Sequence, residues 1–271
     1  MIFVAPFLAF MVVVFLIPLG FIAYTSVDGS ALTTAHYVSV FTGRLYQRVL
    51  WNTLEISIVS AIFTLVLAYP IAYHLSRQPP RRRALFAMLV LLPFYTSILV
   101  KSFAFTVILG HSGIINELLR ALVSPDFSVK LLFNRTGVII GLVHLFIPFM
   151  VFPILTSLLA QNPLLVKAAE VMGASPWRIF WKVTFPLSLP GVLAGVLLSI
   201  IMGMGIFVTP ALLGGRTDMM MANLVDFHIR SSLDWPMASA IAIVLLILSS
   251  IFILLLAQVR GGELFGGSRG H

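Results

Sequence analysis

Apolar residues dominate six long stretches of the chain, and polar residues gather between them. A hydrocarbon layer about 30 Å thick is crossed by about 20 helical residues, so each stretch is long enough to span a bilayer as one helix. Helices satisfy their own backbone hydrogen bonds inside lipid. The pattern therefore predicts an all-α polytopic membrane protein with six transmembrane helices. They are expected at about 2–24, 51–75, 85–109, 136–160, 188–210 and 236–258.

The first stretch has two possible roles, a retained helix or a cleaved secretory signal. Its sequence, MIFVAPFLAFMVVVFLIPLGFIAY, has no basic residue at its start and is followed by no small-residue cleavage motif. Signal peptides combine a basic start with a shorter apolar core. We therefore expect residues 2–24 to remain as a membrane span.

The composition supports a membrane protein: 60% of the residues are hydrophobic, 10% are charged, and the mean hydropathy is +1.08. A soluble domain usually has about 25% charged residues. The net charge of +8 does not indicate nucleic-acid binding, because the basic residues are grouped in short loops between apolar runs. The absence of cysteine excludes disulfides and thiolate chemistry.

The basic residues also predict the orientation of the chain. With six spans, both termini lie on one side of the membrane. The segments on that side carry nine Lys or Arg residues and two acids, whereas the opposite loops carry seven and six. Cytoplasmic loops are enriched in Lys and Arg. We therefore expect both termini and residues 161–187 to be cytoplasmic.

Residues 161–187 form a polar insert between two apolar runs, and the sequence predicts that it begins with a short helix. Asn162 followed by Pro163 is a typical start, because asparagine caps a free backbone N–H and proline fits the first helical position. Gly173 is a typical stop, because glycine adopts the left-handed conformation that ends many helices. A helix of about ten residues is about 15 Å long, which is too short to span a bilayer.

A second short helix is expected after this stop. Ser175 and Pro176 form its start by the same chemistry, and Pro186 is expected to end it. The side chains of Trp177 and Trp181 are large enough to anchor a protein interface. Tryptophan is also common at the level of lipid headgroups, so both interpretations of these two residues stay open.

The run KAAEVMGASPWRIFWKVTFP resembles the EAA loop of permease subunits of ATP-binding-cassette importers. The pattern in that family is Glu-Ala-Ala, three residues, Gly, nine residues and Ile-x-Leu-Pro. Ala168, Ala169, Gly173 and Pro186 fall on this pattern, whereas Lys167 stands where the family has Glu. The resemblance implies a cytoplasmic coupling helix that docks in a groove of an ATPase subunit. The residues expected to contribute to this coupling are Lys167, Ala168, Ala169, Glu170, Gly173, Ala174, Ser175 and Pro186.

Residues 50–260 are similar, in the order and spacing of their motifs, to the spermidine/putrescine permease group of these importers. Among the stretches that carry the similarity are LLPFYTSILVKSFAFTVILGHSGIINELL and LFIPFMVFPILTSLLAQNPLLVKAA. The similarity implies a type I importer permease fold, two ATPase subunits, a second homologous permease, an extracytoplasmic substrate-binding protein and the bacterial inner membrane. It favours a polyamine as substrate, with a phosphonate, an opine or ferric iron as alternatives. A channel or secondary carrier would need no ATPase and leaves the coupling segment unexplained.

No catalytic motif is present in the chain. The sequence has no G-x-x-x-x-G-K-[ST] phosphate loop, no H-E-x-x-H and no G-x-S-x-G. A phosphate loop binds nucleotide phosphates through backbone N–H groups and a lysine, so ATP and Mg²⁺ are expected on partner ATPase subunits. We expect no cofactor, no metal site and no catalytic residue in this chain, which is interpreted as a transport subunit and not as an enzyme.

Two ionisable residues lie within predicted spans, Glu55 in the second and Lys101 in the third. A charge at the bilayer centre costs about 2.5–3.5 kcal/mol, so it lines a cavity, pairs with another charge or reaches toward the interface. The positive charge of Lys101 would repel a polyamine and attract an anion, unless Glu55 faced it and neutralised it. Glu55 is also close enough to the end of its predicted span to lie at the membrane interface. Together with Tyr95, these two residues are the candidates for the substrate pathway.

The loops opposite the termini are expected to carry interfacial helices and a docking surface. The segment GIINELLRAL has apolar residues at helical spacing, which is typical of a helix on a membrane surface. The last of these loops has mixed charges that suit the docking of a binding protein, although a solvated loop has the same composition. The candidate docking residues are Arg216, Asp218, Asp226, Arg230 and Asp234.

Overall fold

The computed structural model describes residues 5–28 and 32–266, and the regular structure in these residues is helical. In chain order the elements are α1 (Ala5–Ser26), α2 (Ala35–Thr42), α3 (Arg44–Ser76), α4 (Pro80–Leu91), the 3-10 segment η1 (Leu92–Tyr95), α5 (Ile98–Leu109), α6 (Ile114–Leu122), α7 (Arg135–Leu159), α8 (Pro163–Val171), α9 (Pro176–Ile179), the π-helical segment η2 (Phe180–Thr184), α10 (Phe185–Met204), α11 (Val208–Leu213), α12 (Met221–Arg230) and α13 (Trp235–Gly266). The expected all-α architecture is confirmed.

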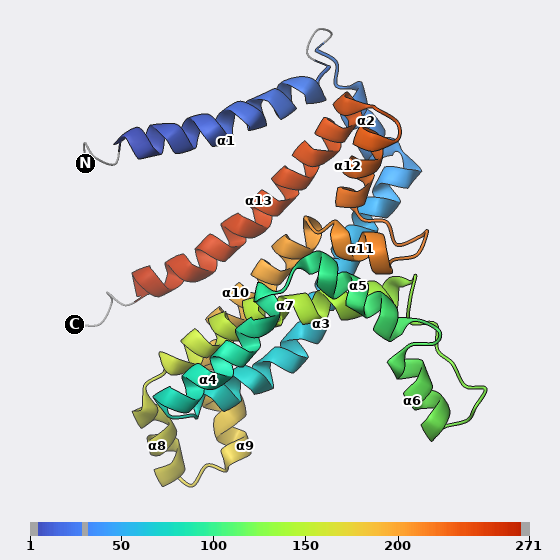
Figure 1. Ribbon diagram of the computed structural model, residues 1–271. Coiled ribbons are helices and arrows are strands. Elements are labelled where there is room, and N and C mark those ends of the chain that lie inside the picture. Colours follow the sequence, from blue (N-terminus) through green and yellow to red (C-terminus); the bar gives the residue numbers. More distant parts are fainter. Residues whose placement is uncertain (1–4, 29–31, 267–271) are drawn as a thin grey trace.

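Three long helices, α3, α7 and α10, pack against one another at the centre of the molecule (Figure 1). The buried apolar side chains between them include Ala61, Ala68, Met150, Ile154 and Met204. The approach of α10 to α7 requires glycine at position 191, where a Cβ would lie 2.5 Å from the backbone carbonyl oxygen of Pro153. Small residues let helix backbones approach closely, which strengthens packing between helices in lipid.

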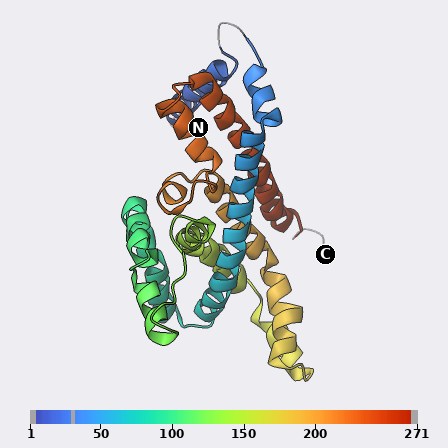
Figure 2. The same ribbon diagram turned by 90° about the vertical axis from the view of Figure 1, so that its right-hand side faces the viewer.

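The remaining helices give the molecule two distinct ends. α8 and α9 lie at one end, whereas α2 and α12 lie at the opposite end (Figure 1). The long helix α3 runs between these ends (Figure 2). α1 lies apart from the central bundle and packs against α13. We refer to the two regions below as the α8–α9 end and the α2–α12 end.

Within the described residues, five helical stretches are long and apolar enough to cross a membrane. They are Arg44–Ser76, Ile98–Leu122, Arg135–Leu159, Pro176–Met204 and Trp235–Gln258. The apolar helix Phe10–Ser26 is shorter, and residues 2–4 of the first predicted span lie outside the described residues. Helices therefore occupy the predicted spans with two exceptions. The span predicted over residues 188–210 is divided, because α10 ends at Met204 and α11 begins only at Val208. The other exception is an interruption between α4 and α5, and the number of crossings stays a prediction.

The interruption falls in the single helix that was predicted over residues 85–109. α4 and α5 are separated by η1 and by two residues with extended backbone, Thr96 and Ser97, whose ψ angles are 138° and 135°. Pro93 contributes to the break, because proline lacks a backbone N–H and cannot donate to a carbonyl of the preceding helical turn. This part of the chain therefore has a bend where a straight span was expected.

The second helix of the polar insert does not end at Pro186, so that prediction is wrong. The helix continues from α9 through η2 into α10. The ring of a proline clashes with the carbonyl four residues earlier in a regular α-helix, and the wider turn of η2, in which the N–H of Phe185 donates to the carbonyl of Phe180, accommodates it. The side chain of Gln161 donates to the Thr184 carbonyl at 2.9 Å, within this altered turn.

The helix expected from GIINELLRAL is present as α6, directly after α5. Asn116 is a buried residue of α6. Its side chain donates to the carbonyls of Gly110 and Val129 and accepts from the N–H of Val129. The apolar residues Ile114, Leu118 and Leu122 are exposed on α6. This arrangement fits a helix that lies against a membrane surface.

Candidate functional site

The start of the polar insert has the helix caps that its sequence predicts. The side chain of Asn162 accepts from the N–H of Leu164 at 3.0 Å, at the first turn of α8. The hydroxyl of Ser175 accepts from the N–H of Arg178 at 3.4 Å, at the first turn of α9. Each contact satisfies a backbone donor that has no partner within its own helix.

Gly173 forms the corner between α8 and α9. Its φ angle is +78°, in the left-handed region that side chains with a Cβ rarely adopt. The N–H of Gly173 donates to the carbonyl of Glu170 at 2.9 Å, and the N–H of Ala174 donates to that of Ala169 at 3.0 Å. These two bonds form a Schellman motif, which ends the helix and turns the chain. No other atom lies within 4 Å of a Cβ built on Gly173, so the requirement for glycine comes from the backbone angle.

The tip of this corner exposes large apolar side chains. Val171 is 89% exposed, Met172 is 80% exposed and Trp177 is 72% exposed. We call these three residues the apolar tip. Of the predicted coupling residues, Ala169 is buried, Ala174 is partly buried, and the others are exposed: Lys167, Ala168, Glu170, Gly173, Ser175 and Pro186.

The insert contacts the central bundle through aromatic rings. Phe180 meets Tyr69 and Tyr73 of α3 edge to face, at centroid distances of 5.8 and 5.6 Å. The hydroxyl of Tyr69 also lies 2.9 Å from the hydroxyl of Ser188 in α10. Edge-to-face pairs of this kind stabilise packing beyond the area that they bury, so α3 and the start of α10 are held together at the α8–α9 end.

The predicted pathway residue Lys101 lies at the break between α4 and α5. Its Nζ donates to the Pro93 carbonyl at 2.8 Å, and this carbonyl also accepts from the N–H of Thr96 at 3.3 Å. Lys101 and Phe94 also line a groove of about 440 Å³ that reaches Phe149 of α7 and Met202 of α10. Tyr95, next to Phe94, is 82% exposed.

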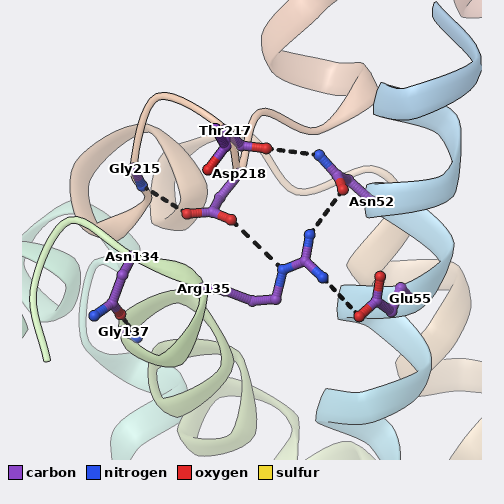
Figure 3. A network of polar contacts seen from close by, with 8 residues as sticks. All are labelled: Asn52, Glu55, Asn134, Arg135, Gly137, Gly215, Thr217 and Asp218. Carbon is purple, nitrogen blue, oxygen red and sulfur yellow. Dashed lines mark hydrogen bonds and ion pairs between the residues drawn. The ribbon is translucent and has the colours of Figure 1, made fainter.

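Glu55 does not face Lys101, so it does not neutralise the charge of that lysine. Its Oε1 accepts from Nη1 of Arg135, the first residue of α7, at 2.6 Å (Figure 3). The Nη2 of Arg135 donates to Oδ1 of Asn52 at 2.8 Å. The Nε of Arg135 lies 3.5 Å from Oδ1 of Asp218. We call these four residues the Arg135 network.

The predicted docking residues do not form one surface. Asp218 is buried, so it is unavailable as an exposed docking residue. Asp226 and Arg230 form an exposed ion pair of 2.6 Å on α12. Asp234 accepts from the N–H of Met237 and caps the start of α13, whereas Arg216 is exposed in the loop before α12.

Sequence reasoning missed Arg135, because the helix prediction treated it as the end of a loop. The sequence does contain a feature that points to an ion pair: Arg135 is a basic residue at the start of one predicted span, and the acidic Glu55 lies near the start of another. Opposite charges near the ends of two spans can pair if those spans are neighbours. The sequence does not show which spans are neighbours, so it cannot select Arg135 among the basic residues.

His228 is a second residue that the sequence did not single out. It is buried at the α2–α12 end, where its Nε2 lies 3.3 Å from the Tyr46 hydroxyl and its Nδ1 lies 3.0 Å from the Ser232 hydroxyl. Burial lowers the pKa of His228, and the nearby carboxylate of Asp234 opposes that shift. Among the described residues, no group of three or more His, Asp or Glu side chains is arranged to hold a metal ion.

Comparison with known proteins gives the family of the chain. The family described as "Binding-protein-dependent transport system inner membrane component" matches residues 55–261. The spermidine/putrescine transport system permease protein PotB of Haemophilus influenzae is 33% identical over 237 residues, which are 86% of this chain and 82% of that protein. PotB of Escherichia coli K12 is 33% identical over 210 residues, which are 78% of this chain and 76% of that protein.

A solved structure shows the same fold. The crystal structure of a bacterial alginate ABC transporter, in complex with an alginate pentasaccharide-bound periplasmic protein, contains a chain that aligns with a TM-score of 0.78. The alignment covers 99% of this chain and 95% of that one, at 18% sequence identity. The expectations of an importer permease fold and of a transport subunit that is not an enzyme are confirmed. The chain therefore belongs to the family of binding-protein-dependent transport system inner membrane components, the permease subunits of ATP-binding-cassette importers.

Proposed function

We propose that α8 and α9 dock on a separate ATPase subunit and transmit its ATP-driven movements to the membrane helices of this permease. The observation that carries the proposal is the apolar tip, at which Val171, Met172 and Trp177 are exposed together at the end of a polar segment. Exposed apolar clusters of this kind are typical of protein interfaces. A partner subunit would remove these side chains from water.

The backbone supports this coupling role. The helix that begins at Pro176 continues without interruption to Met204, so a displacement of α9 is carried into α10 without a flexible linker. The Schellman corner at Gly173 ends α8 through two backbone hydrogen bonds and fixes the turn of the chain toward α9. Coupling then becomes a shift between inward-facing and outward-facing states, each favoured by a different partner or ligand.

We propose a polyamine as the substrate, because the PotB relatives are named for spermidine and putrescine. The groove beside η1 suits an ammonium group through the aromatic rings of Phe94 and Phe149. The positive charge of Lys101 opposes the binding of a cation in this groove. The ammonium of Lys101 donates to the Pro93 carbonyl. A phosphonate, an opine or ferric iron is the competing assignment.

The proposed assembly contains two ATPase subunits that bind ATP and Mg²⁺, a second homologous permease and an extracytoplasmic binding protein. Both chain termini and the α8–α9 end face the cytoplasm, in agreement with the higher share of Lys and Arg on that side. The α2–α12 end then faces the binding protein. Arg216 and the Asp226–Arg230 pair are exposed there and are the residues proposed to meet it.

Uptake by proteoliposomes tests the coupling role. The permease, its homologous partner, the ATPase and the binding protein are reconstituted together, and ATP-driven uptake of labelled spermidine and putrescine is measured. The Gly173→Val variant is expected to lose uptake, because a β-branched side chain is strained at a φ angle of +78°. Gly173→Asn tolerates the left-handed conformation and is expected to retain uptake.

Gly20→Val is the matched control, because a Cβ at that position meets no atom within 4 Å and the backbone angle is ordinary. It is expected to transport like the wild type. Wild-type uptake by Gly173→Val would contradict the coupling role. ATP-driven uptake of a labelled phosphonate or of ferric iron, without uptake of labelled spermidine or putrescine, would contradict the substrate while leaving the coupling role intact.

A further inference from the structure

The Arg135 network lies at the α2–α12 end, and none of the roles proposed above requires it. Arg135 uses all three guanidinium nitrogens, each toward a different side chain (Figure 3). A lysine has a single nitrogen and cannot reproduce this planar fork. Asp218 is buried, whereas the side chains of Arg135 and Glu55 are each 36% exposed. Because a buried carboxylate is costly unless it is paired, the network favours one arrangement of the segments that supply its members.

The network fixes the loop between α11 and α12 on α3. The side chain of Asn52 donates to the carbonyl of Thr217 at 2.8 Å. The carboxylate of Asp218 accepts from the N–H of Gly215 at 3.1 Å. At the end of the same loop, the N–H of Met221 donates to the hydroxyl of Thr53 at 2.8 Å. Asn52 and Thr53 both belong to α3, so the position of this loop depends on the position of that helix.

The same helix reaches the polar insert at the other end of the molecule. α3 contains 33 residues and is therefore about 50 Å long. Near its last turns, Tyr69 and Tyr73 contact Phe180, and the hydroxyl of Tyr69 meets that of Ser188. One continuous helix thus has side-chain contacts with the loop at the α2–α12 end and with η2 and α10, which follow α9 in the chain.

We infer that α3 links the outer loop, residues 214–220, to the ATPase-facing segment, and that Arg135 is the positioning residue that ties the loop to α3. Arrival of the binding protein at the loop is then communicated to the ATPase through this helix. The inference rests on the proposed docking of α8 and α9, and it adds a route by which the two faces of the membrane are coupled. Its energetic content is a coupling free energy between two distant sites.

The test uses the complete complex with the Arg135→Met variant. Three quantities are measured: co-purification of the subunits, ATP hydrolysis without binding protein, and ATP hydrolysis with substrate-loaded binding protein. We expect assembly and basal hydrolysis to stay as in the wild type. The stimulation by the binding protein is expected to fall by about fivefold or more, within the usual range of allosteric coupling. The Arg135→Lys variant should keep part of the stimulation by the binding protein, since one charged contact remains.

Arg48→Met is the matched control, because Arg48 is exposed near the start of α3, the helix to which Arg135 ties the loop. It should be stimulated like the wild type. Wild-type stimulation of Arg135→Met would overturn the inference, and so would a proportional loss of basal and stimulated hydrolysis, which indicates a general structural defect. If Arg135→Met prevents assembly, the same three quantities are measured with Glu55→Gln and judged in the same way. Glu55→Gln keeps an acceptor for Arg135 while removing the charge.

A double variant tests the route through α3. Tyr69→Phe removes the contact with Ser188 at the other end of the helix. If both residues act through α3, stimulation in the Arg135→Met, Tyr69→Phe double variant is lowered by less than the product of the two single effects. Independent, multiplicative effects would contradict the route. Failure of the proposed function is distinguishable, because Gly173→Val would then retain wild-type uptake.

Discussion

At the α2–α12 end, polar side chains are buried and paired with one another, whereas at the α8–α9 end large apolar side chains are exposed. Asp218 is 6% exposed and interacts with Arg135, but Val171 is 89% exposed. The buried carboxylate of Asp218 specifies a geometry inside the chain, because leaving it without a partner is costly. The exposed apolar residues contribute little to the stability of the isolated chain. Substitutions at the first end should therefore affect folding, and substitutions at the second should affect association.

The largest expected effect is at the apolar tip. Trp177→Asp should weaken binding of the ATPase subunit by about 30-fold, since a buried aromatic residue at an interface often contributes about 2 kcal/mol. The melting temperature of the isolated permease in detergent should not change. Trp235→Asp is the control, because Trp235 is also exposed but lies at the other end of the molecule. Unchanged ATPase binding by Trp177→Asp would instead support a position among lipid headgroups.

Asp218→Ala tests the opposite end. It should lower the free energy of unfolding by about 2 kcal/mol, because it removes a buried partner of Arg135 and of the Gly215 N–H. Binding of the ATPase should stay at the wild-type level. Asp226→Ala removes an exposed ion pair within α12 and should cost less than about 0.5 kcal/mol. Equal losses in the two variants would show that the network is not a special contributor to stability.

A smaller effect is expected at the cap of α9. Ser175→Ala removes the acceptor for the N–H of Arg178 and should destabilise this turn by about 1 kcal/mol. If the turn must be folded for docking, the affinity for the ATPase falls by at most about fivefold. Ser175→Asp keeps a good cap and should bind normally. A loss of affinity in both variants would indicate direct contact by the serine hydroxyl.

The smallest expected effect is a pH dependence at the α2–α12 end. Burial lowers the pKa of His228 below its unfolded value, so its neutral form contributes stability above about pH 6.5, and that contribution is lost as the pH falls. The melting temperature should therefore drop more between about pH 7.5 and about pH 5.5 in the wild type than in His228→Gln. Identical pH profiles would show that this histidine is not responsible.

Features that depend on neighbours along the chain were predictable from the sequence. The caps at Asn162 and Ser175 and the left-handed turn at Gly173 follow from residue type and spacing, and they are confirmed. Pro186 is the instructive exception, because proline usually ends a helix but here the chain widens into a π turn and continues. The local rule was outweighed by packing: Phe180 and Phe185 of this turn both pack against the ring of Tyr69.

Features that depend on which helices are neighbours were not predictable. The sequence indicates that Glu55 needs a partner or an interfacial position, but it does not show that this partner is Arg135, which lies 80 residues away in the sequence. Asp218 was placed on an exposed surface, but the return of its loop to α3 buries it. Hydropathy shows that a charge needs a partner, yet it does not show which partner the fold supplies.

The sequence by itself determined that this protein is helical, that it is apolar enough for a membrane and that a capped polar insert interrupts the apolar runs. Those properties arise from composition and from contacts within a few residues of the chain. Only the tertiary structure decided that α3 contacts Arg135 near one end and Phe180 near the other. The physical reason is that packing among α3, α7 and α10 sets which side chains meet, and this packing depends on residues distant in the sequence.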